Sequence, residues 1–309
     1  MTPIIFIAGA TGTQGTALVK ALTSSASPPI IHALARDISS PQSQNIAALG
    51  VKLFQGSYQD TSVLTTALQG ATSAFLNLSR GVNDADHEIN EAKSLLVAFK
   101  AAGIKHIVYS SAMAANDPTK LFRYREDSFV GSLMRSKQAI EKEVRSAGFD
   151  TWTILRPGNF MSNHLKPLPF IFPGLVETGV WSTVYTKETR IPMIDPATIG
   201  AFAAAALLDP QRFHKDEIPL SDEFLTVEAL LSTLSRVSGR QLTATFMSDD
   251  EIESKLPTMP VLEAQINMRN MDIYADMDKL KTYGIKLSSF DSFIDGHASH
   301  TRTAYAKQG

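Results

Sequence analysis

The amino-acid sequence predicts an α/β fold, a doubly wound parallel sheet with a smaller C-terminal α+β lobe. Two features of the chain support this prediction. In the first half, short apolar runs rich in β-branched residues alternate with amphipathic helical stretches, which is the order of β/α units. Several runs are apolar almost throughout, as expected for parallel strands covered by helices on both faces. The 309 residues, 44% of them hydrophobic, suffice for a large buried core.

Six apolar runs are candidate strands. They are IIFIAG (4–9), IIHALAR (30–36), VKLFQG (51–56), SAFLNLS (73–79), HIVYSS (106–111) and WTILRP (152–157). A helix is predicted over 84–102, because apolar residues recur there on one face. Asp84 and Asp86 stand near its start and Gly103 follows its end, which suits the helix dipole and the C-terminal turn.

Two more helices are predicted in the second half. One begins at Asp195 and Pro196 and covers 196–208, and the other extends from its cap, Thr226, to Gly239. Residues 156–179 are rich in Pro and Gly and read as a long irregular excursion, whereas 250–309 support no assignment. We expect a first domain over 1–155 and a smaller lobe over 156–309, interleaved so that helix 196–208 returns to the first domain.

Composition excludes several kinds of function. A net charge of −2 and a pI near 6.4 argue against direct binding of nucleic acid. The chain has no cysteine, and its seven histidines lack ligand spacing, so neither thiolate catalysis nor a metal site is expected. No signal peptide is recognised, and the longest apolar stretch, AFAAAALL, is too short to span a bilayer. We expect a cytoplasmic protein, with the nucleus as the alternative, and no membrane association.

Three glycines, Gly9, Gly12 and Gly15, stand between the first strand and a helical stretch. In a nucleotide-binding βαβ unit, such a turn brings backbone N–H groups against a pyrophosphate at a helix N-terminus. Gly9 would make the tight turn, Gly12 would admit the phosphates, and Gly15 would let the helix pack on the sheet. The spacing is GxxGxxG rather than GxGxxG, and the alternative is an ordinary glycine-rich turn. The position between strand and helix favours a dinucleotide.

The second strand ends in LARD, which bears on the choice of dinucleotide. A carboxylate there would bind the ribose hydroxyls of NAD, whereas an arginine pairs with the 2′-phosphate of NADP. Because Arg36 precedes Asp37, the sequence favours NADP(H). A surface ion pair between these two neighbours is the alternative.

Four segments together resemble the NmrA-like family of atypical short-chain dehydrogenase/reductases. They are GATGTQG (9–15), YSSAM (109–113), SKQAIEKEVRSAGFDTWTILRPGNFM (136–161) and IPMIDPATIG (191–200). The resemblance covers most of the first 210 residues. It implies an NADP(H)-binding Rossmann domain and a smaller substrate-binding lobe. Family members include reductases similar to isoflavone and quinone reductases, and also proteins that bind the dinucleotide and regulate transcription without turnover.

The resemblance also implies site residues, each by its position in the matching segments. The cofactor-binding residues are Gly9, Thr11, Gly12, Thr13, Gln14 and Gly15 at the pyrophosphate, Arg36 at the 2′-phosphate, Asn77, Leu78 and Ser79 along the middle, Lys137 at the ribose, and Pro157, Asn159 and Phe160 at the nicotinamide amide. Ser110 and Ser111 end the fifth strand, where the superfamily carries a hydroxyl near the nicotinamide.

The chain departs from the family pattern at two places. Ser57 stands where relatives often carry an aspartate near adenine, which leaves Tyr58 or Gln59 to supply that contact. The YxxxK pair of the superfamily is incomplete, because Lys137 has Leu133, not tyrosine, four residues before it. No phenol is therefore available at that place to donate a proton.

Lys137 lies on the apolar stripe of the helix over 132–148, so its charge is expected to point inward. A buried ammonium needs a partner, and ribose hydroxyls are the partner that the resemblance implies. The alternative is a lysine that snorkels at the edge of the stripe. Tyr124 and His164 are candidate proton donors on loops, with an ordinary loop residue as the alternative for each.

Two functions follow. The first is an NADPH-dependent reductase of a small, largely apolar carbonyl or enone compound, with Lys137 and Ser111 as catalytic residues and the stretch PLPFIFPGL (167–175) lining an apolar pocket. The alternative is a non-catalytic NADP(H)-binding redox sensor or transcriptional regulator that acts through a protein partner, as the missing tyrosine suggests. Either protein would be a monomer or a homodimer.

Overall fold

The computed structural model describes residues 2–81, 86–167, 171–259 and 261–306, and it divides into two compact units. Unit 1 comprises Met1–Ala115, Ser132–Pro157 and Pro196–Ile218, and unit 2 the remainder. Residues 116–131, expected in the first domain, fall in unit 2, whereas 196–218, with the helix expected to return to the first domain, fall in unit 1. No helix in the described part of the chain is long and apolar enough to cross a membrane.

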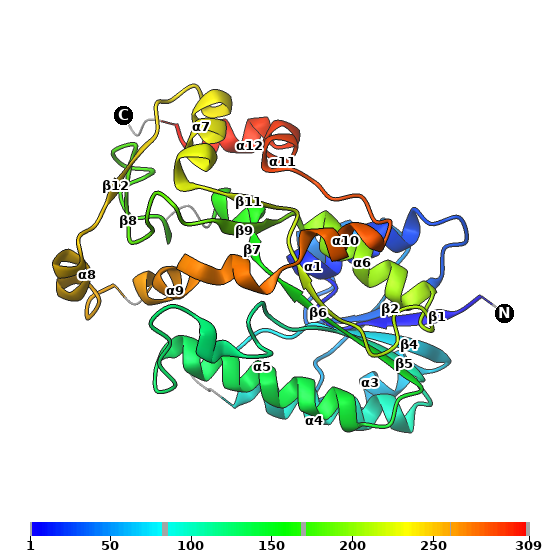
Figure 1. Ribbon diagram of the computed structural model, residues 1–309. Helices are drawn as coiled ribbons and strands as arrows, with labels where there is room; N and C mark the ends of the chain where they lie inside the picture. Colours follow the sequence, from blue (N-terminus) through cyan, green and yellow to red (C-terminus); the bar gives the residue numbers. More distant parts are fainter. Residues whose placement is uncertain (1, 82–85, 168–170, 260, 307–309) are drawn as a thin grey trace. The chain divides into compact units, whose positions relative to one another are not determined.

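Unit 1 is built on a seven-stranded sheet in the order β10-β6-β5-β4-β1-β2-β3 (Figure 1). The strands are β1 (Ile4–Ile7), β2 (Ile30–Ala35), β3 (Lys52–Gln55), β4 (Ala71–Leu76), β5 (His106–Ser110), β6 (Thr151–Pro157) and β10 (Glu217–Leu220). All six predicted strands are present, and the pairings among them are parallel. The chain reverses its direction of winding between β1 and β4, and ligands bind at the carboxyl ends of strands at such a point.

Helices cover both faces of this sheet, which confirms the doubly wound α/β fold. They are α1 (Thr13–Thr23), α2 (Pro41–Ala47), α3 (Thr61–Leu68), α4 (His87–Ala101), α5 (Phe129–Ser146) and α6 (Pro196–Leu208). On one face α6 packs against α1 and against β4, β5 and β6. The helix predicted over 84–102 is α4, although its expected first residues, with Asp84, lie outside the described residues.

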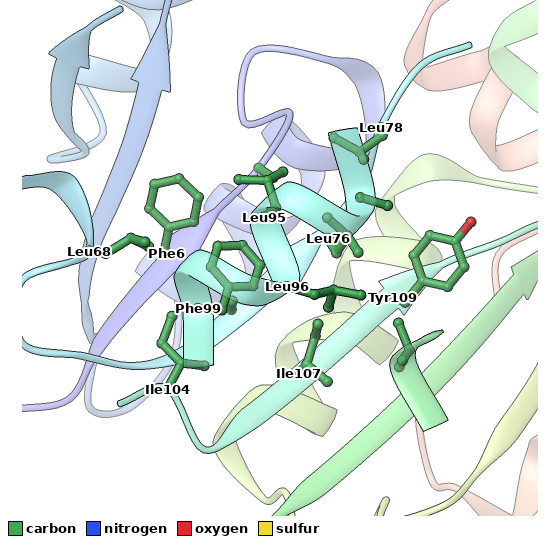
Figure 2. Packing of buried hydrophobic residues seen from close by; sticks show 14 of the residues in the cluster. Phe6, Leu68, Leu76, Leu78, Leu95, Leu96, Phe99, Ile104, Ile107 and Tyr109 are labelled. Carbon is green, nitrogen blue, oxygen red and sulfur yellow. The ribbon is translucent and has the colours of Figure 1, made fainter. Parts of the chain in front are cut away.

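The opposite face carries the main hydrophobic core. Phe6 of β1 and Tyr109 of β5 pack with Leu68 of α3 and with Leu95 and Phe99 of α4 (Figure 2). The Phe6 and Phe99 rings meet edge to face, with their centroids 5.6 Å apart. Burying these side chains, at roughly 1.5–3 kcal/mol each, fixes α4 against the strand ends that carry the predicted site.

Unit 2 has an α+β architecture with two small sheets. One has the order β11-β9-β7 and the other β12-β8. The strands are β7 (Asn159–Phe160), β8 (Val180–Thr183), β9 (Ile191–Ile194), β11 (Glu223–Leu225) and β12 (Thr243–Phe246). The helices are α7 (Val227–Ser238), α8 (Asp249–Lys255), α9 (Val261–Asn267), α10 (Met277–Thr282), α11 (Phe290–Gly296) and α12 (Ala298–Ala304), with short 3₁₀ turns at Pro118–Lys120, Met161–His164 and Met268–Tyr274.

Local signals explain several of these elements. The hydroxyl of Thr226 accepts a hydrogen bond from the Ala229 N–H and caps α7, and Gly239 ends this helix at a φ of 72°. Both predicted helices of the second half, α6 and α7, are confirmed. The tail is mostly helical, and α8 begins with a capping box between Ser248 and Glu251. Within the stretch 167–175, residues 168–170 lie outside the described residues.

Candidate functional site

The turn from β1 to α1 needs glycine at two positions for steric reasons. Gly9 has a φ of +73°, and a Cβ there would lie 2.5 Å from the carbonyl oxygen of Asn77. A Cβ on Gly15 would lie 2.2 Å from the carbonyl oxygen of Gly9. Real Cβ atoms do not approach backbone atoms so closely, because van der Waals repulsion rises steeply at that distance. The two glycines therefore allow the turn to pack against the end of β4 and the first turn of α1.

Gly12 differs from these two glycines, because the protein's own packing does not require it. Its φ is −80°, and a Cβ there would meet only the Gly9 carbonyl oxygen, at 3.3 Å. It is the N-cap of α1, with no side-chain cap and no acidic residue in the first turn. The N–H groups at the start of α1 thus carry the positive end of the helix dipole. They form a cradle for an anion that a side chain on Gly12 would fill.

A cavity of about 530 Å³ opens beside this cradle in unit 1. Its walls come from the glycine turn, the carboxyl ends of β2, β3 and β4, and the first turns of α4. Eight sequence-predicted residues line it together, namely Gly9, Thr11, Gly12, Gln14, Arg36, Asn77, Leu78 and Ser79. Of the other predicted cofactor residues in α1, Thr13 is exposed and Gly15 is buried beneath the turn.

A chain of hydrogen bonds ties the glycine turn to the neighbouring strand ends. The side chain of Gln14 donates from Nε2 to Oδ1 of Asn77 (3.1 Å), and its Oε1 accepts from the hydroxyl of Ser110 (2.6 Å). The Gly9 N–H donates to the hydroxyl of Tyr58 (2.7 Å). Burial raises the pKa of Tyr58 to about 12, so this hydroxyl keeps its proton at neutral pH. The turn is thus held in place before any ligand binds.

Arg36 supplies positive charge to the cavity. It is exposed at the end of β2, and it is the sole arginine or lysine among the described residues that line the cavity. The alternative ion pair with Asp37 does not form, because Asp37 accepts hydrogen bonds from the N–H and the hydroxyl of Ser39. These bonds also lower the pKa of Asp37. The guanidinium remains available to an anionic ligand.

Lys137 points inward from α5, as the stripe predicts, but its partner is a carboxylate of the protein. Its ammonium binds the carboxylate of Glu88 on α4. Glu88 is 0% exposed and Lys137 is 9% exposed. Ser136 donates its hydroxyl to the second oxygen of Glu88 (3.1 Å). The alternative, a lysine that snorkels at the edge of the stripe, is not observed. The charge of Lys137 thus neutralises Glu88 and joins two helices.

Ser111 is also engaged by a buried carboxylate. Its hydroxyl donates to Glu141 of α5 (2.7 Å), which accepts further bonds from Arg156 and Arg145. Both arginines donate charge-assisted hydrogen bonds to this carboxylate. Neither Ser111 nor Lys137 is among the described residues lining the cavity. Sequence reasoning pointed Lys137 inward and placed Ser111 at the end of the fifth strand, but it did not identify the carboxylates that bind them.

The residues predicted at the nicotinamide amide divide between the two units. Pro157 ends β6 in unit 1, whereas Asn159 and Phe160 form the short strand β7 in unit 2. Asn159 donates from Nδ2 to the sulfur of Met193 (3.4 Å) and accepts from Asn163 (3.2 Å). Both Asn159 and Phe160 are half-buried.

Neither loop residue considered as a proton donor gains support from its surroundings. His164 is buried in unit 2, stacked on Phe172 at 4.4 Å and edge-on to Phe290 at 5.4 Å between ring centroids. Burial lowers the pKa of His164 to about 3, so the imidazole is neutral at physiological pH. Tyr124 is half-buried in the segment 116–131 of unit 2. A neutral, enclosed imidazole is a core group and not a general acid.

Sequence reasoning missed the part of the cavity wall that includes the first turns of α4. Gly56, His87 and Glu91 line the cavity, as do Tyr58 and Gln59, which were considered for adenine. His87 and Glu91 lie four residues apart and so share one face of α4. The spacing of these two polar residues was the signal that could have identified this wall, but only the apolar residues were used to predict the helix.

Comparison with known proteins identifies a family and similar structures. The NmrA-like family matches residues 1–294. A (4-alkanoyl-5-oxo-2,5-dihydrofuran-3-yl)methyl phosphate reductase of Streptomyces griseus is 30% identical over 264 residues, 84% of each chain. The crystal structure of the NADPH-dependent quinone oxidoreductase QOR2 of Escherichia coli in complex with NADPH is similar with a TM-score of 0.71 at 24% identity, over 95% of this chain and 99% of that one.

A second similar structure is that of NmrA, a negative transcriptional regulator, in complex with NADP. Its TM-score is 0.64 at 19% identity, and the match covers 98% of this chain and 95% of that one. The family match spans nearly the whole chain, and the Streptomyces reductase is similar in sequence over most of it. The chain therefore belongs to the NmrA-like family.

Proposed function

We propose that the protein is an NADPH-dependent oxidoreductase that reduces a small, largely apolar carbonyl or enone compound. The observation that carries this proposal is the cradle at Gly12 opening onto the same cavity as Arg36. A dinucleotide with a 2′-phosphate has two anionic groups, and the cavity offers a helix N-terminus for one and a guanidinium for the other. The NADPH complex of the E. coli quinone oxidoreductase supports the choice of cofactor.

Each part of the cavity then has a role towards the cofactor. The pyrophosphate would lie at Gly9, Thr11 and Gly12, with Thr13, Gln14 and Gly15 forming the helix start beneath it. Arg36 would bind the 2′-phosphate. The middle of the cofactor would follow the residues after β4, which are Asn77, Leu78 and Ser79. When bound, the cofactor supplies a hydride to the substrate.

The relatives' names support a conjugated carbonyl compound as the substrate class. The substrate in the name of the Streptomyces reductase is a dihydrofuran ring that carries an oxo group, an alkanoyl group and a methyl phosphate, and the E. coli relative is named for quinones. In both compounds a carbonyl group is conjugated with a carbon–carbon double bond. Hydride addition to such a system places negative charge on oxygen, and the site must stabilise that charge.

The resemblance implies catalytic roles for Lys137 and Ser111, whereas this proposal gives them structural roles. Glu88 holds the Lys137 ammonium, and Glu141 accepts the Ser111 hydroxyl proton in a hydrogen bond. We propose that these contacts hold α5 against α4, whose first turns line the cavity, and against the end of β5. The hydroxyl of Ser110 holds Gln14, which supports the same turn.

Transfer of deuterium from NADPH labelled at C4 tests the proposal. The purified protein is incubated with NADPH that carries deuterium at both C4 positions and with a panel of cyclic enones and aldehydes, whose products keep the transferred deuterium on carbon, and the products are examined by mass spectrometry. We expect one deuterium per molecule of product with at least one conjugated carbonyl compound. Absence of label in every product, while NADPH binds, would overturn the reductase proposal. The variant Gly12→Ala is the control that lacks the phosphate cradle.

A second candidate is a redox-sensing regulator that binds NADP(H) and acts through a protein partner. The observation that favours it is that Lys137 and Ser111 are both engaged by buried carboxylates and that Leu133 replaces the tyrosine. The similar structure of the NmrA regulator in complex with NADP is consistent with it. This function predicts cofactor binding without deuterium transfer, and one labelled product excludes a purely non-catalytic role.

A further inference from the structure

One wall of the cavity takes no part in the proposed binding of phosphates. It consists of Tyr58 and Gln59, which follow β3, and of His87 and Glu91, which lie on the first turns of α4. The side chain of Glu91 is only 13% exposed, although it belongs to a cavity wall. A carboxylate on a cavity wall offers hydrogen-bond acceptors to a ligand in that cavity and is matched by N–H or O–H donors.

The donors that the protein supplies leave part of this carboxylate unused. Gln59 donates from Nε2 to Oε1 of Glu91 (3.3 Å), and Nε2 of His87 lies 3.9 Å from the same oxygen. The second oxygen, Oε2, accepts no hydrogen bond from the described part of the chain. Since Gln59 and Glu91 come from different elements, their bond fixes the carboxylate on the cavity wall with one acceptor unfilled.

The charges around Tyr58 show that Glu91 and Arg36 act on one small region. Burial is the main cause of the raised pKa of Tyr58, the negative charge of Glu91 adds to it, and the positive charge of Arg36 opposes it. Both charges therefore lie near the same hydroxyl. A region bordered by the proposed 2′-phosphate site on one side and by a carboxylate on the other suits a phosphorylated adenosine.

The unfilled acceptor must be matched with a donor of that adenosine. A carboxylate repels phosphate, so the complementary group is an N–H or O–H of the nucleoside. The adenine base offers its 6-amino group, which lies at the end of the nucleoside opposite the ribose. The residues after β3 that line the cavity, Gly56, Ser57, Tyr58 and Gln59, carry no carboxylate, so Glu91 is the acidic acceptor in the described lining.

We propose that Glu91, oriented by Gln59, accepts a hydrogen bond from the 6-amino group of the adenine of NADP(H) and selects adenine over 6-oxopurines. The inference rests on the proposed function. It assigns base selection to α4, whereas Arg36 selects the phosphorylated ribose. The acceptor thus comes from α4, 34 residues beyond Ser57, and not from the residues that follow β3.

A dinucleotide altered only at the base tests this assignment. Nicotinamide hypoxanthine dinucleotide phosphate carries an oxo group in place of the 6-amino group, and its affinity is compared with that of NADP⁺ by calorimetric titration. We expect the wild-type protein to bind NADP⁺ at least about tenfold more tightly, because the oxo group would face an unpaired carboxylate oxygen. The ratio of the two affinities is compared between variants, because a substitution that weakens the binding of both dinucleotides equally leaves this ratio unchanged.

Two variants and a control complete the experiment. In Glu91→Gln the amide can donate to the oxo group, so the ratio should fall to within about threefold. Gln59→Leu should lower the ratio by a smaller factor, since the carboxylate stays but loses its orienting bond. Glu143→Gln is the matched control, because Glu143 lies on α5 and pairs with Lys93 outside the cavity lining. It should keep the wild-type ratio.

The outcomes distinguish failure of the adenine assignment from failure of the proposed function. Equal binding of both dinucleotides by the wild type, or an unchanged ratio in Glu91→Gln, would overturn the assignment and leave NADP(H) binding intact. An unchanged ratio in Gln59→Leu would overturn the orienting role of Gln59. If the wild type binds neither dinucleotide, the proposed function fails and the assignment falls with it. Thermal denaturation of every variant establishes that it is folded.

Discussion

Substituting the three glycines of the turn by alanine, one at a time, separates their steric role from their binding role. Gly15→Ala places a Cβ 2.2 Å from the Gly9 carbonyl oxygen and 2.5 Å from Cα of Ala10. Both are backbone atoms, so the start of α1 must move. Gly9→Ala adds a positive φ to a clash of 2.5 Å with the Asn77 carbonyl oxygen. Gly12→Ala meets one atom at 3.3 Å and keeps an ordinary φ.

These distances lead to different expected losses of stability. Forcing extra volume into a packed site costs roughly 1–3 kcal/mol and sometimes more, so Gly9→Ala and Gly15→Ala should each lose about 3 kcal/mol of unfolding free energy. Gly12→Ala loses at most about 1 kcal/mol, because alanine is a poorer N-cap than glycine. Its Cβ nevertheless enters the space where backbone N–H groups would receive a phosphate. We expect its affinity for NADPH to fall at least about a hundredfold.

The assay pairs chemical unfolding in urea with calorimetric titration of NADPH for each variant. Gly296→Ala serves as the control, since a Cβ at Gly296, the last residue of α11, meets no atom within 4 Å. It should leave the affinity for NADPH unchanged and raise the unfolding free energy by at most about 1 kcal/mol, because alanine favours a helix more than glycine does. If Gly12→Ala binds NADPH as the wild type does, the cradle does not hold the pyrophosphate. If Gly15→Ala is as stable as the wild type, the steric reasoning is wrong.

Two further predictions concern buried titratable groups. Lys137→Ala leaves Glu88 buried without a counter-charge and should lower the unfolding free energy, measured in urea, by about 3–5 kcal/mol. The double variant Lys137→Met with Glu88→Gln should recover most of this loss, because it removes both charges. Equal stability of the single and the double variant would contradict the pairing. His164 has its pKa lowered to about 3 by burial, so it stays neutral in the folded protein while the unfolded chain takes up a proton below about pH 6.5. Stability should therefore decrease by up to about 1.4 kcal/mol per pH unit as the pH falls from 6.5 towards 3, and His164→Phe should remove that slope in urea titrations at pH 6.5, 5.5 and 4.5; an identical slope in the variant would refute the assignment.

Much of the site could be predicted because its signals are local in the sequence. The glycine turn and Arg36 sit at fixed offsets from two apolar strands, and strand, turn and helix each leave a pattern within a few residues. The inward direction of Lys137 followed from the stripe of its own helix. The structure places the turn, Arg36 and the residues after β4 around one cavity, in agreement with those offsets.

The unpredicted features depend on pairs that are distant in the chain. Glu88 lies 49 residues before Lys137, and Gln59 lies 32 residues before Glu91. Nothing within either segment marks the other as its partner, because only the packing of α4 beside the sheet brings them together. The Ser248 and Glu251 capping box, by contrast, was a local signal in the sequence that would have identified α8.

The most direct test of the central claim is a calorimetric titration with NADPH, NADP⁺, NADH and NAD⁺, repeated with Arg36→Ala. We expect the two phosphorylated cofactors to bind more tightly than their counterparts by roughly tenfold to a hundredfold, because a charged hydrogen bond to the 2′-phosphate contributes about 1.5–3 kcal/mol. The substitution should remove most of this preference while leaving the affinity for NADH nearly unchanged. Failure of all four to bind, or a preference for NADPH that survives Arg36→Ala, would contradict the account.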